Sequence, residues 1–139
     1  MNILIINGPN LNMLGKREPE IYGSISFEDY FLQLVENFPN IRLEYFQSNH
    51  EGEIIDKLQV SIEKFDAVII NPGGYTHTSV AIADAIRSIS IPVYEVHISN
   101  IYARESFRAQ SFTAAACKGI ISGFGLKGYK LAILAILNE

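Results

Sequence analysis

The chain has 139 residues, 48% of them hydrophobic, so it is long enough to bury one substantial core and too short for two domains of ordinary size. Its 11 basic and 15 acidic residues give a net charge of −4, and no basic run stands out, which argues against nucleic acid or an anionic membrane as a partner. We therefore expect one domain over residues 1–139 that binds a small molecule.

Cysteine usage and the length of the apolar runs limit where in the cell the protein is expected. The single cysteine, Cys117, excludes a disulfide within the chain, and no Cys and His spacing typical of a metal site occurs. The first apolar run, residues 3–6, is too short for the core of a signal peptide, and no later run reaches membrane-spanning length. These features predict a cytoplasmic protein without a structural metal.

Short apolar runs alternate with helical patterns along the chain. Five runs predict strands, at residues 3–6, 41–46, 67–70, 93–96 and 120–121. Four stretches with apolar residues at helical spacing predict helices, at residues 27–38, 54–65, 80–89 and 126–137. Ser26 and Asp29 resemble a capping box before the first helix, and either Thr78 or Ser79 is expected to cap the third.

This alternation predicts an α/β fold, an open doubly wound parallel sheet with right-handed crossovers. The simplest version is flavodoxin-like, with strand order 2-1-3-4-5. Ligands of such sheets bind at the carboxyl ends of the strands where the order reverses, between strands 1 and 3. Residues 7–10, 71–77 and 95–99 all follow strands at that edge, so we expect their polar side chains to meet in one cleft.

The fourth predicted strand runs directly into polar groups. Glu95 and His97 are two residues apart and share a face of the strand, so the carboxylate can accept a hydrogen bond from one ring nitrogen and leave the other directed past the strand end. Such a pair is typical of a general acid. The plainer alternative is a histidine with only a structural role at the end of a strand.

Further candidates lie on the loops around this edge. The connection over residues 11–25 is much longer than the roughly 2 to 6 residues that a loop between strand and helix needs, so we interpret it as a lid carrying Arg17 and Tyr22. His77 precedes a helix N-terminus, which favours an anion nearby.

Several common functions of this fold lack their motifs here. No nucleophile elbow, Walker loop or Rossmann glycine fingerprint is present, and Asn7 and Asn71 stand where response regulators need acidic residues. The loop after the first strand also lacks the hydroxyl-rich cradle for flavin mononucleotide. A flavodoxin-like nucleotide or flavin carrier is the alternative to an enzyme.

Seven short motifs occur in order along the chain: NGPNLN at 7–12, YG at 22–23, SNHEG at 48–52, NPG with YTHTS within 71–79, EVH with SN within 95–100, RE with FR within 104–108, and GFG at 123–125. Together they resemble type II 3-dehydroquinate dehydratase over essentially the whole chain. The departures are Gly74, Ala83 and Tyr102, where the family commonly has other residues. None of the three falls on a catalytic position of the family.

The resemblance implies a single catalytic domain that dehydrates 3-dehydroquinate to 3-dehydroshikimate. The elimination of water is anti and passes through an enolate, without a metal, a cofactor or a Schiff base. The same reaction serves the shikimate pathway and quinate breakdown, and the sequence leaves that choice open. The family also implies a homododecamer built from trimers.

The resemblance assigns roles to individual residues. Its catalytic set is Tyr22 as the base, Arg17 to lower the pKa of the tyrosine, Asn10 at the enolate oxygen, and His97 as the acid oriented by Glu95. Its substrate contacts are Asn71, His77, Ile98 through its N–H, Ser99 and Arg108. Asp84 would contact the substrate of a neighbouring subunit. Read from position alone, Tyr22 is equally a loop anchor and Asp84 a solvated helix residue.

Overall fold

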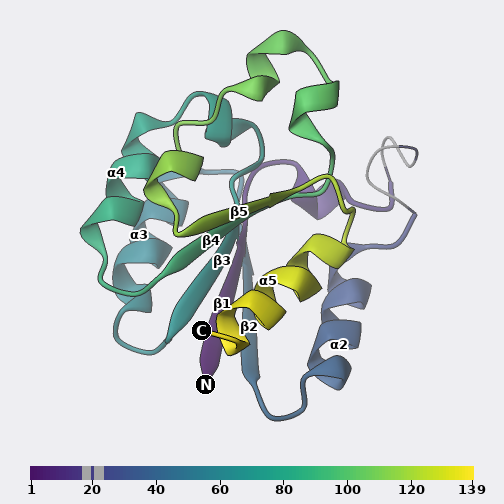
Figure 1. Ribbon diagram of the computed structural model, residues 1–139, viewed down its shortest axis with the longest axis vertical. Helices are drawn as coiled ribbons and strands as arrows, with labels where there is room; N and C mark the ends of the chain where they lie inside the picture. The colour runs from purple at the N-terminus through teal and green to yellow at the C-terminus, as the bar shows by residue number, and fades with distance from the viewer. Residues whose placement is uncertain (17–19, 21–23) are drawn as a thin grey trace.

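Five strands form one parallel sheet in a computed structural model that describes residues 1–16, 20 and 24–139. The strands are β1 (Asn2–Asn7), β2 (Arg42–Gln47), β3 (Ala67–Asn71), β4 (Val93–His97) and β5 (Gly119–Ser122). Their order across the sheet is β2-β1-β3-β4-β5, with every neighbouring pair parallel (Figure 1). The predicted fold class and strand order are confirmed.

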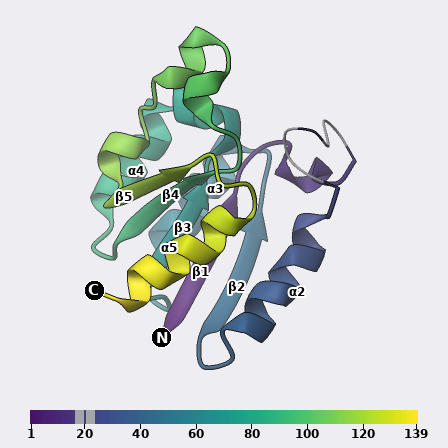
Figure 2. The same ribbon diagram turned by 45° about the vertical axis from the view of Figure 1, so that its right-hand side comes forward.

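Helices cover both faces of the sheet, as the continuous apolar strands require. On one face lie α2 (Phe27–Asn37) and α5 (Lys127–Leu137), and on the other α3 (Glu51–Ser61) and α4 (Val80–Ser88) (Figures 1 and 2). Among the described residues, no helix is long and apolar enough to cross a membrane.

Alternation along the strands divides the core into two layers. Ile3 and Ile5 of β1 pack in the cluster with α2 and α5, whereas Leu4 and Ile6 pack in the cluster with α3 and α4. All four are fully buried, and burying such a side chain stabilises the fold by roughly 1.5–3 kcal/mol. Residues 3–6 of β1 therefore leave no room for a polar side chain.

The helix boundaries follow the predicted caps with one exception. The Ser26 hydroxyl accepts a hydrogen bond from the N–H of Asp29 at 3.2 Å, and Ser79, not Thr78, caps α4 by accepting from the N–H of Ile82 at 2.9 Å. The prediction that the second helix reaches residue 65 is wrong, because α3 ends at Ser61.

The hydrophobic pattern predicted a helix end that is too late, because the last apolar residues of the pattern belong to the turn that leads into β3. Ile62 is 49% exposed, whereas Phe65 reaches the core from outside the helix. The Phe65 N–H donates to the carbonyl of Ser61 at 2.9 Å, which closes this turn.

Short 3₁₀ helices follow the carboxyl ends of β1, β3 and β4. The segment between β4 and β5 contains three of them: η3 (Ile101–Ala103), η4 (Ser106–Ala109) and η5 (Ala114–Ala116). Two more follow β1 and β3: η1 (Leu11–Met13) and η2 (Gly73–His77). In Figure 1 the segment carrying η3 and η4 rises above the sheet, at the end opposite both chain termini.

The ends of β1 and β3 approach so closely that only glycine fits between them. The N–H of Gly8 donates to the carbonyl of Asn71 at 2.7 Å, and a β-carbon at position 8 would lie 2.4 Å from the carbonyl oxygen of Pro72. This contact sets the spacing of the two loops that begin there.

We therefore expect Gly8→Ala to lower the free energy of unfolding by about 1–3 kcal/mol, because the backbone must shift to accommodate the methyl group. The matched control is Gly52→Ala in α3, where a β-carbon meets nothing within 4 Å. There, alanine should be neutral or stabilise by up to about 1 kcal/mol. Urea denaturation of both variants measures the difference, and equal midpoints would contradict it.

Candidate active site

A cleft of about 140 Å³ opens at the carboxyl ends of β1, β3 and β4, where the strand order reverses. Its wall combines the loop after β1, the η2 segment after β3, and the residues that follow β4. Seven of the residues predicted from the sequence line it: Asn10, Asn71, His77, His97, Ile98, Ser99 and Arg108. The topology thus joins side chains that are far apart in the sequence.

The structure describes two of the other four predicted residues, and neither lines this wall. Glu95 lies behind His97 and is fully buried. Asp84 lies on α4, exposed and paired with Arg87 at 3.4 Å, away from the cleft. Tyr22 and Arg17 lie outside the described residues.

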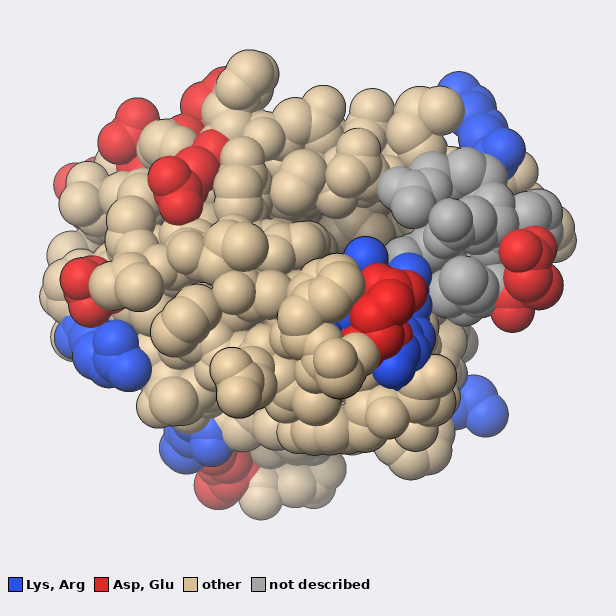
Figure 3. All heavy atoms as spheres, turned by 90° about the horizontal axis from the view of Figure 1, so that it is seen from above, with Lys and Arg blue, Asp and Glu red and all other residues tan. Residues whose placement is uncertain are grey.

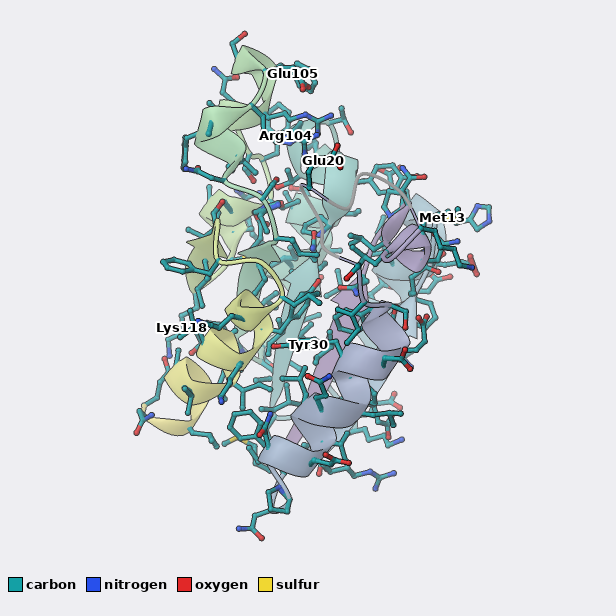
Figure 4. All side chains as sticks on the ribbon, turned by 90° about the vertical axis from the view of Figure 1, so that its right-hand side faces the viewer. Met13, Glu20, Tyr30, Arg104, Glu105 and Lys118 are labelled. Carbon is teal, nitrogen blue, oxygen red and sulfur yellow. The ribbon has the colours of Figure 1, made fainter. Side chains whose placement is uncertain are left out.

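Sequence reasoning gave no role to Arg104, which also lines the cleft. One of its guanidinium nitrogens donates to the hydroxyl of Ser99 at 3.4 Å. Figure 4 shows Arg104 and Glu105 on the segment above the sheet and Met13 on η1 across from it. The signal for Arg104 in the sequence was its position four residues before Arg108. That spacing identifies a basic segment but does not say which arginine faces the cleft.

Glu95 and His97 form the hydrogen bond expected from their spacing. The distance from Nε2 of His97 to Oε2 of Glu95 is 2.7 Å, and the two residues are 5% and 0% exposed. Because an ionised carboxylate only accepts, Nε2 carries the proton. No described residue is hydrogen-bonded to Nδ1, so that nitrogen is available to a ligand in the cleft.

The electrostatics of Glu95 favour its ionised form. Burial by itself raises the pKa of this carboxyl group, but the hydrogen bond and charge of His97, together with the hydroxyls of Thr113 and Thr76, hold the pKa below its usual range. Glu95 therefore places a negative charge directly behind the imidazole of His97.

His77 is fixed by a backbone contact. Its Nδ1 lies 2.7 Å from the carbonyl oxygen of Gln110, so Nδ1 donates and Nε2 is the free ring nitrogen. The ring also meets Phe107 edge-on, with centroids 5.9 Å apart. His77 lies two residues before Ser79, the N-cap of α4, so it lies near the positive end of that helix.

Arg108 brings positive charge to the cleft wall. Its Nε donates to Glu105 at 2.6 Å, and this hydrogen bond holds the pKa of Glu105 below its usual range. Its guanidinium carbon also lies 4.9 Å from the ring centroid of Phe107. Viewed onto this edge of the sheet, Figure 3 shows acidic and basic atoms in contact near the middle of a largely uncharged face. A carboxylate ligand would complement this arginine.

Asn71 is held by the protein on two sides. Its Oδ1 accepts from the N–H of Gly73 at 3.1 Å, and its Nδ2 donates to the hydroxyl of Tyr129 at 3.0 Å. The same hydroxyl donates to Oδ1 of Asn7 at 2.7 Å, and all three linked side chains are buried. Asn71 therefore keeps one N–H for a ligand.

No group of three or more His, Cys, Asp or Glu side chains that could hold a metal ion occurs in the part of the chain that the structure describes. The groups with free donor or acceptor capacity at the cleft are imidazole, amide and guanidinium. Such groups can bind a polar organic anion, and an imidazole can also transfer a proton to it.

Comparisons with known proteins identify the same family along nearly the whole chain. The model of the family described as "Dehydroquinase class II" matches residues 1–137. A 3-dehydroquinate dehydratase of Clostridium botulinum is 57% identical over 140 residues, covering 99% of this chain and 95% of the relative. Two solved type II dehydroquinases superpose closely. That of Butyrivibrio crossotus has a TM-score of 0.95 and 52% identity, covering 100% and 98% of the two chains, and that of Propionibacterium acnes has 0.94 and 40%, covering 99% and 97%.

The contacts of Asn71 lead to a prediction for Tyr129→Phe. Removing this hydroxyl leaves amide atoms of Asn7 and Asn71 unpaired in the interior, so the free energy of unfolding should fall by about 2 kcal/mol or more. The control is Tyr75→Phe, which removes a 2.9 Å hydrogen bond to the carbonyl of Asn49 in an exposed setting, where water replaces it. That loss should stay below about 1 kcal/mol. Urea denaturation distinguishes them, and similar losses would contradict the assignment.

Proposed function

The chain belongs to the class II dehydroquinase family, and from that premise we propose that it removes water from 3-dehydroquinate to give 3-dehydroshikimate. The observation that carries the proposal is the family match over residues 1–137. The chain is accordingly an enzyme, a 3-dehydroquinate dehydratase of the shikimate pathway, and the same reaction would also serve quinate breakdown. The flavin or nucleotide carrier considered from the sequence is not favoured.

The reaction begins with removal of a proton from the carbon next to the ketone. We assign this step to Tyr22, the tyrosine of the lid. A free tyrosine has a pKa of about 10, so it needs a nearby positive charge to act as a base at neutral pH. Arg17 on the same loop supplies that charge, and Asn10 stabilises the resulting enolate oxygen through a bound water. Asn10 lines the cleft, and its backbone N–H donates to Oδ1 of Asn49, which supports this assignment.

His97 then protonates the departing hydroxyl. In this step the ring carries protons on both nitrogens, Nε2–H stays with Glu95, and Nδ1 gives its proton to the leaving oxygen. The product of the transfer is a neutral imidazole still hydrogen-bonded to the carboxylate. A positioned general acid of this kind accelerates a reaction by roughly 10²–10⁴-fold. The step uses no metal and no cofactor.

The substrate has one carboxylate and several hydroxyl groups, which matches the donors of the cleft. Its contacts are assigned to the side chains of Asn71, His77, Ser99 and Arg108 and to the N–H of Ile98. Their shared wall supports this assignment.

We regard residues 1–139 as a single catalytic domain. We propose that it assembles in the cytoplasm into a homododecamer built from trimers. Asp84 would then serve the site of a neighbouring subunit. Its exposure on α4, outside its own cleft, supports that role.

The activity itself is tested with the purified protein and 3-dehydroquinate. The conjugated enone of the product absorbs ultraviolet light, so absorbance should rise with time in proportion to enzyme concentration. Sodium borohydride added with substrate should leave activity intact, because no Schiff base forms. An unchanged absorbance would sink the proposed function, and irreversible inactivation with a substrate-sized gain in mass would overturn the imine-free mechanism.

The two proton transfers are separated by deuterium exchange, because they are assigned to different residues. His97→Ala should still exchange the carbon-bound proton of 3-dehydroquinate in heavy water, while elimination slows by roughly a hundredfold or more. Tyr22→Phe should lose both events. NMR of unreacted substrate follows the exchange. Exchange that persists in Tyr22→Phe, or is absent from His97→Ala with substrate still bound, would mean that the base is wrong or the elimination is concerted.

A further inference from the structure

Three hydroxyl side chains contact the carboxylate of Glu95 in addition to His97. The Thr113 hydroxyl donates to Oε1, and the hydroxyls of Thr76 and Ser111 lie 3.0 and 3.2 Å from Oε2. Thr76, Thr113 and Glu95 are all 0% exposed. The buried anion is therefore held mainly by neutral donors.

The three hydroxyls also contact one another. Thr76 lies 2.5 Å from Ser111 and 2.6 Å from Thr113, oxygen to oxygen, and Ser111 lies 3.3 Å from Thr113. Each hydroxyl has a single proton to donate, so a hydroxyl that does not donate to the carboxylate donates to a neighbour. Glu95 is thus the acceptor at which these hydrogen bonds end, and such a chain polarises toward the charge.

These hydroxyls come from two segments that are tied together independently of Glu95. Thr76 belongs to η2 after β3, whereas Ser111 and Thr113 lie between η4 and η5. The N–H of Phe112 donates to the carbonyl of Thr76 at 2.8 Å, and His77 donates to the carbonyl of Gln110 at 2.7 Å. The positions of the three hydroxyls are therefore set by hydrogen bonds to backbone carbonyls that do not involve Glu95.

We propose that Thr76, Ser111 and Thr113 are positioning residues that hold Glu95 as an anion in one orientation, and through it keep the proton of His97 on Nε2 and Nδ1 directed at the substrate. The inference rests on the dehydratase reaction proposed above, in which Nδ1 is the acid. With different donors on its two oxygens, the carboxylate cannot turn about its last bond without breaking them. Thr113 matters most, because the only other group within reach of Oε1 in the described chain is the thiol of Cys117 at 3.9 Å.

The surroundings give the proposal a direction in pH. The titratable groups facing Glu95 are His97 on its own strand and Cys117, whose pKa is raised by burial and by Glu95, so the thiol stays neutral. Ile70 of β3 and Ile120 of β5 are its partners in register. His77, Arg104 and Arg108 line the same cleft as His97.

Losing a hydroxyl removes an interaction that lowers the pKa of Glu95, so its pKa rises. The charge of Glu95 is present above that pKa and lost as the pH falls through it. The acidic limb of the activity profile should therefore move to higher pH.

The test compares Thr113→Val, which keeps the size of threonine but replaces its hydroxyl with a methyl group, with Thr113→Ser, which keeps the hydroxyl and loses the methyl group. For Thr113→Val we expect kcat to fall about tenfold, part of the roughly hundredfold or more that loss of a general acid causes, with little change in KM and an upward shift of the acidic limb. Thr113→Ser should restore most of the loss. Ser61→Ala removes another buried hydroxyl, bonded only to the carbonyl of Leu58 in α3, and should leave kinetics unchanged.

A second measurement does not depend on turnover. Ring ¹⁵N NMR of the free enzyme, assigned among the three histidines with His97→Gln, should report a proton on Nε2 in the wild type and a mixture of tautomers in Thr113→Val. A folded Thr113→Val protein with wild-type kcat, pH profile and ring signals would overturn the proposal. If Thr113→Val does not fold, Ser111→Ala, which removes a half-buried hydroxyl, is judged by the same criteria. A wild type that leaves 3-dehydroquinate unchanged would instead refute the proposed function, while the ring signals still decide whether Thr113 sets the tautomer.

Discussion

A carboxylate buried at the carboxyl-terminal edge of the sheet is the constraint on which the cleft depends. An unpaired charge in the interior costs several kcal/mol, and His97 and the surrounding hydroxyls offset that cost for Glu95. Those partners come from β4 itself, from η2 and from the segment before η5. The same interactions that stabilise this buried carboxylate therefore also hold His97, the acid proposed for the active site, so stability and the proposed function are joined at one residue.

The parallel sheet explains why partners from distant segments meet there. Each strand of a parallel sheet ends at the same edge, and the reversal of order between β1 and β3 opens a gap that the loops line. Alternation then assigns the polar side chains to opposite faces. Asn71 follows Ile69 toward the layer of α5, where Tyr129 holds it, whereas Glu95 and His97 follow Val93 toward the layer of α3 and α4. The cleft thus receives one set of groups from each layer, each held by buried contacts of its own.

Local patterns in the sequence predict much of this correctly. Unbroken apolar runs in β1 and β3 indicate strands covered on both faces, Ser26 marks the start of α2, and the spacing of two between Glu95 and His97 predicts their hydrogen bond. The predicted end of α3 was wrong because Phe65 contributes to the core from a turn. Hydrophobic spacing does not distinguish a core residue in a helix from one in a turn. Arg104 was missed because its direction depends on how the segment after β4 folds back.

Periodicity and short motifs of adjacent residues were enough to predict the fold class, the strand order and the family. The groups that surround Glu95 could be identified only in the folded chain. Thr76 lies 19 residues before it, and Thr113 lies 18 residues after it, separated by chain with no periodic relation between them. Hydrogen bonds act over about 3 Å in space whatever the separation in sequence, so their partners are fixed only when the backbone contacts between the two loops bring them together.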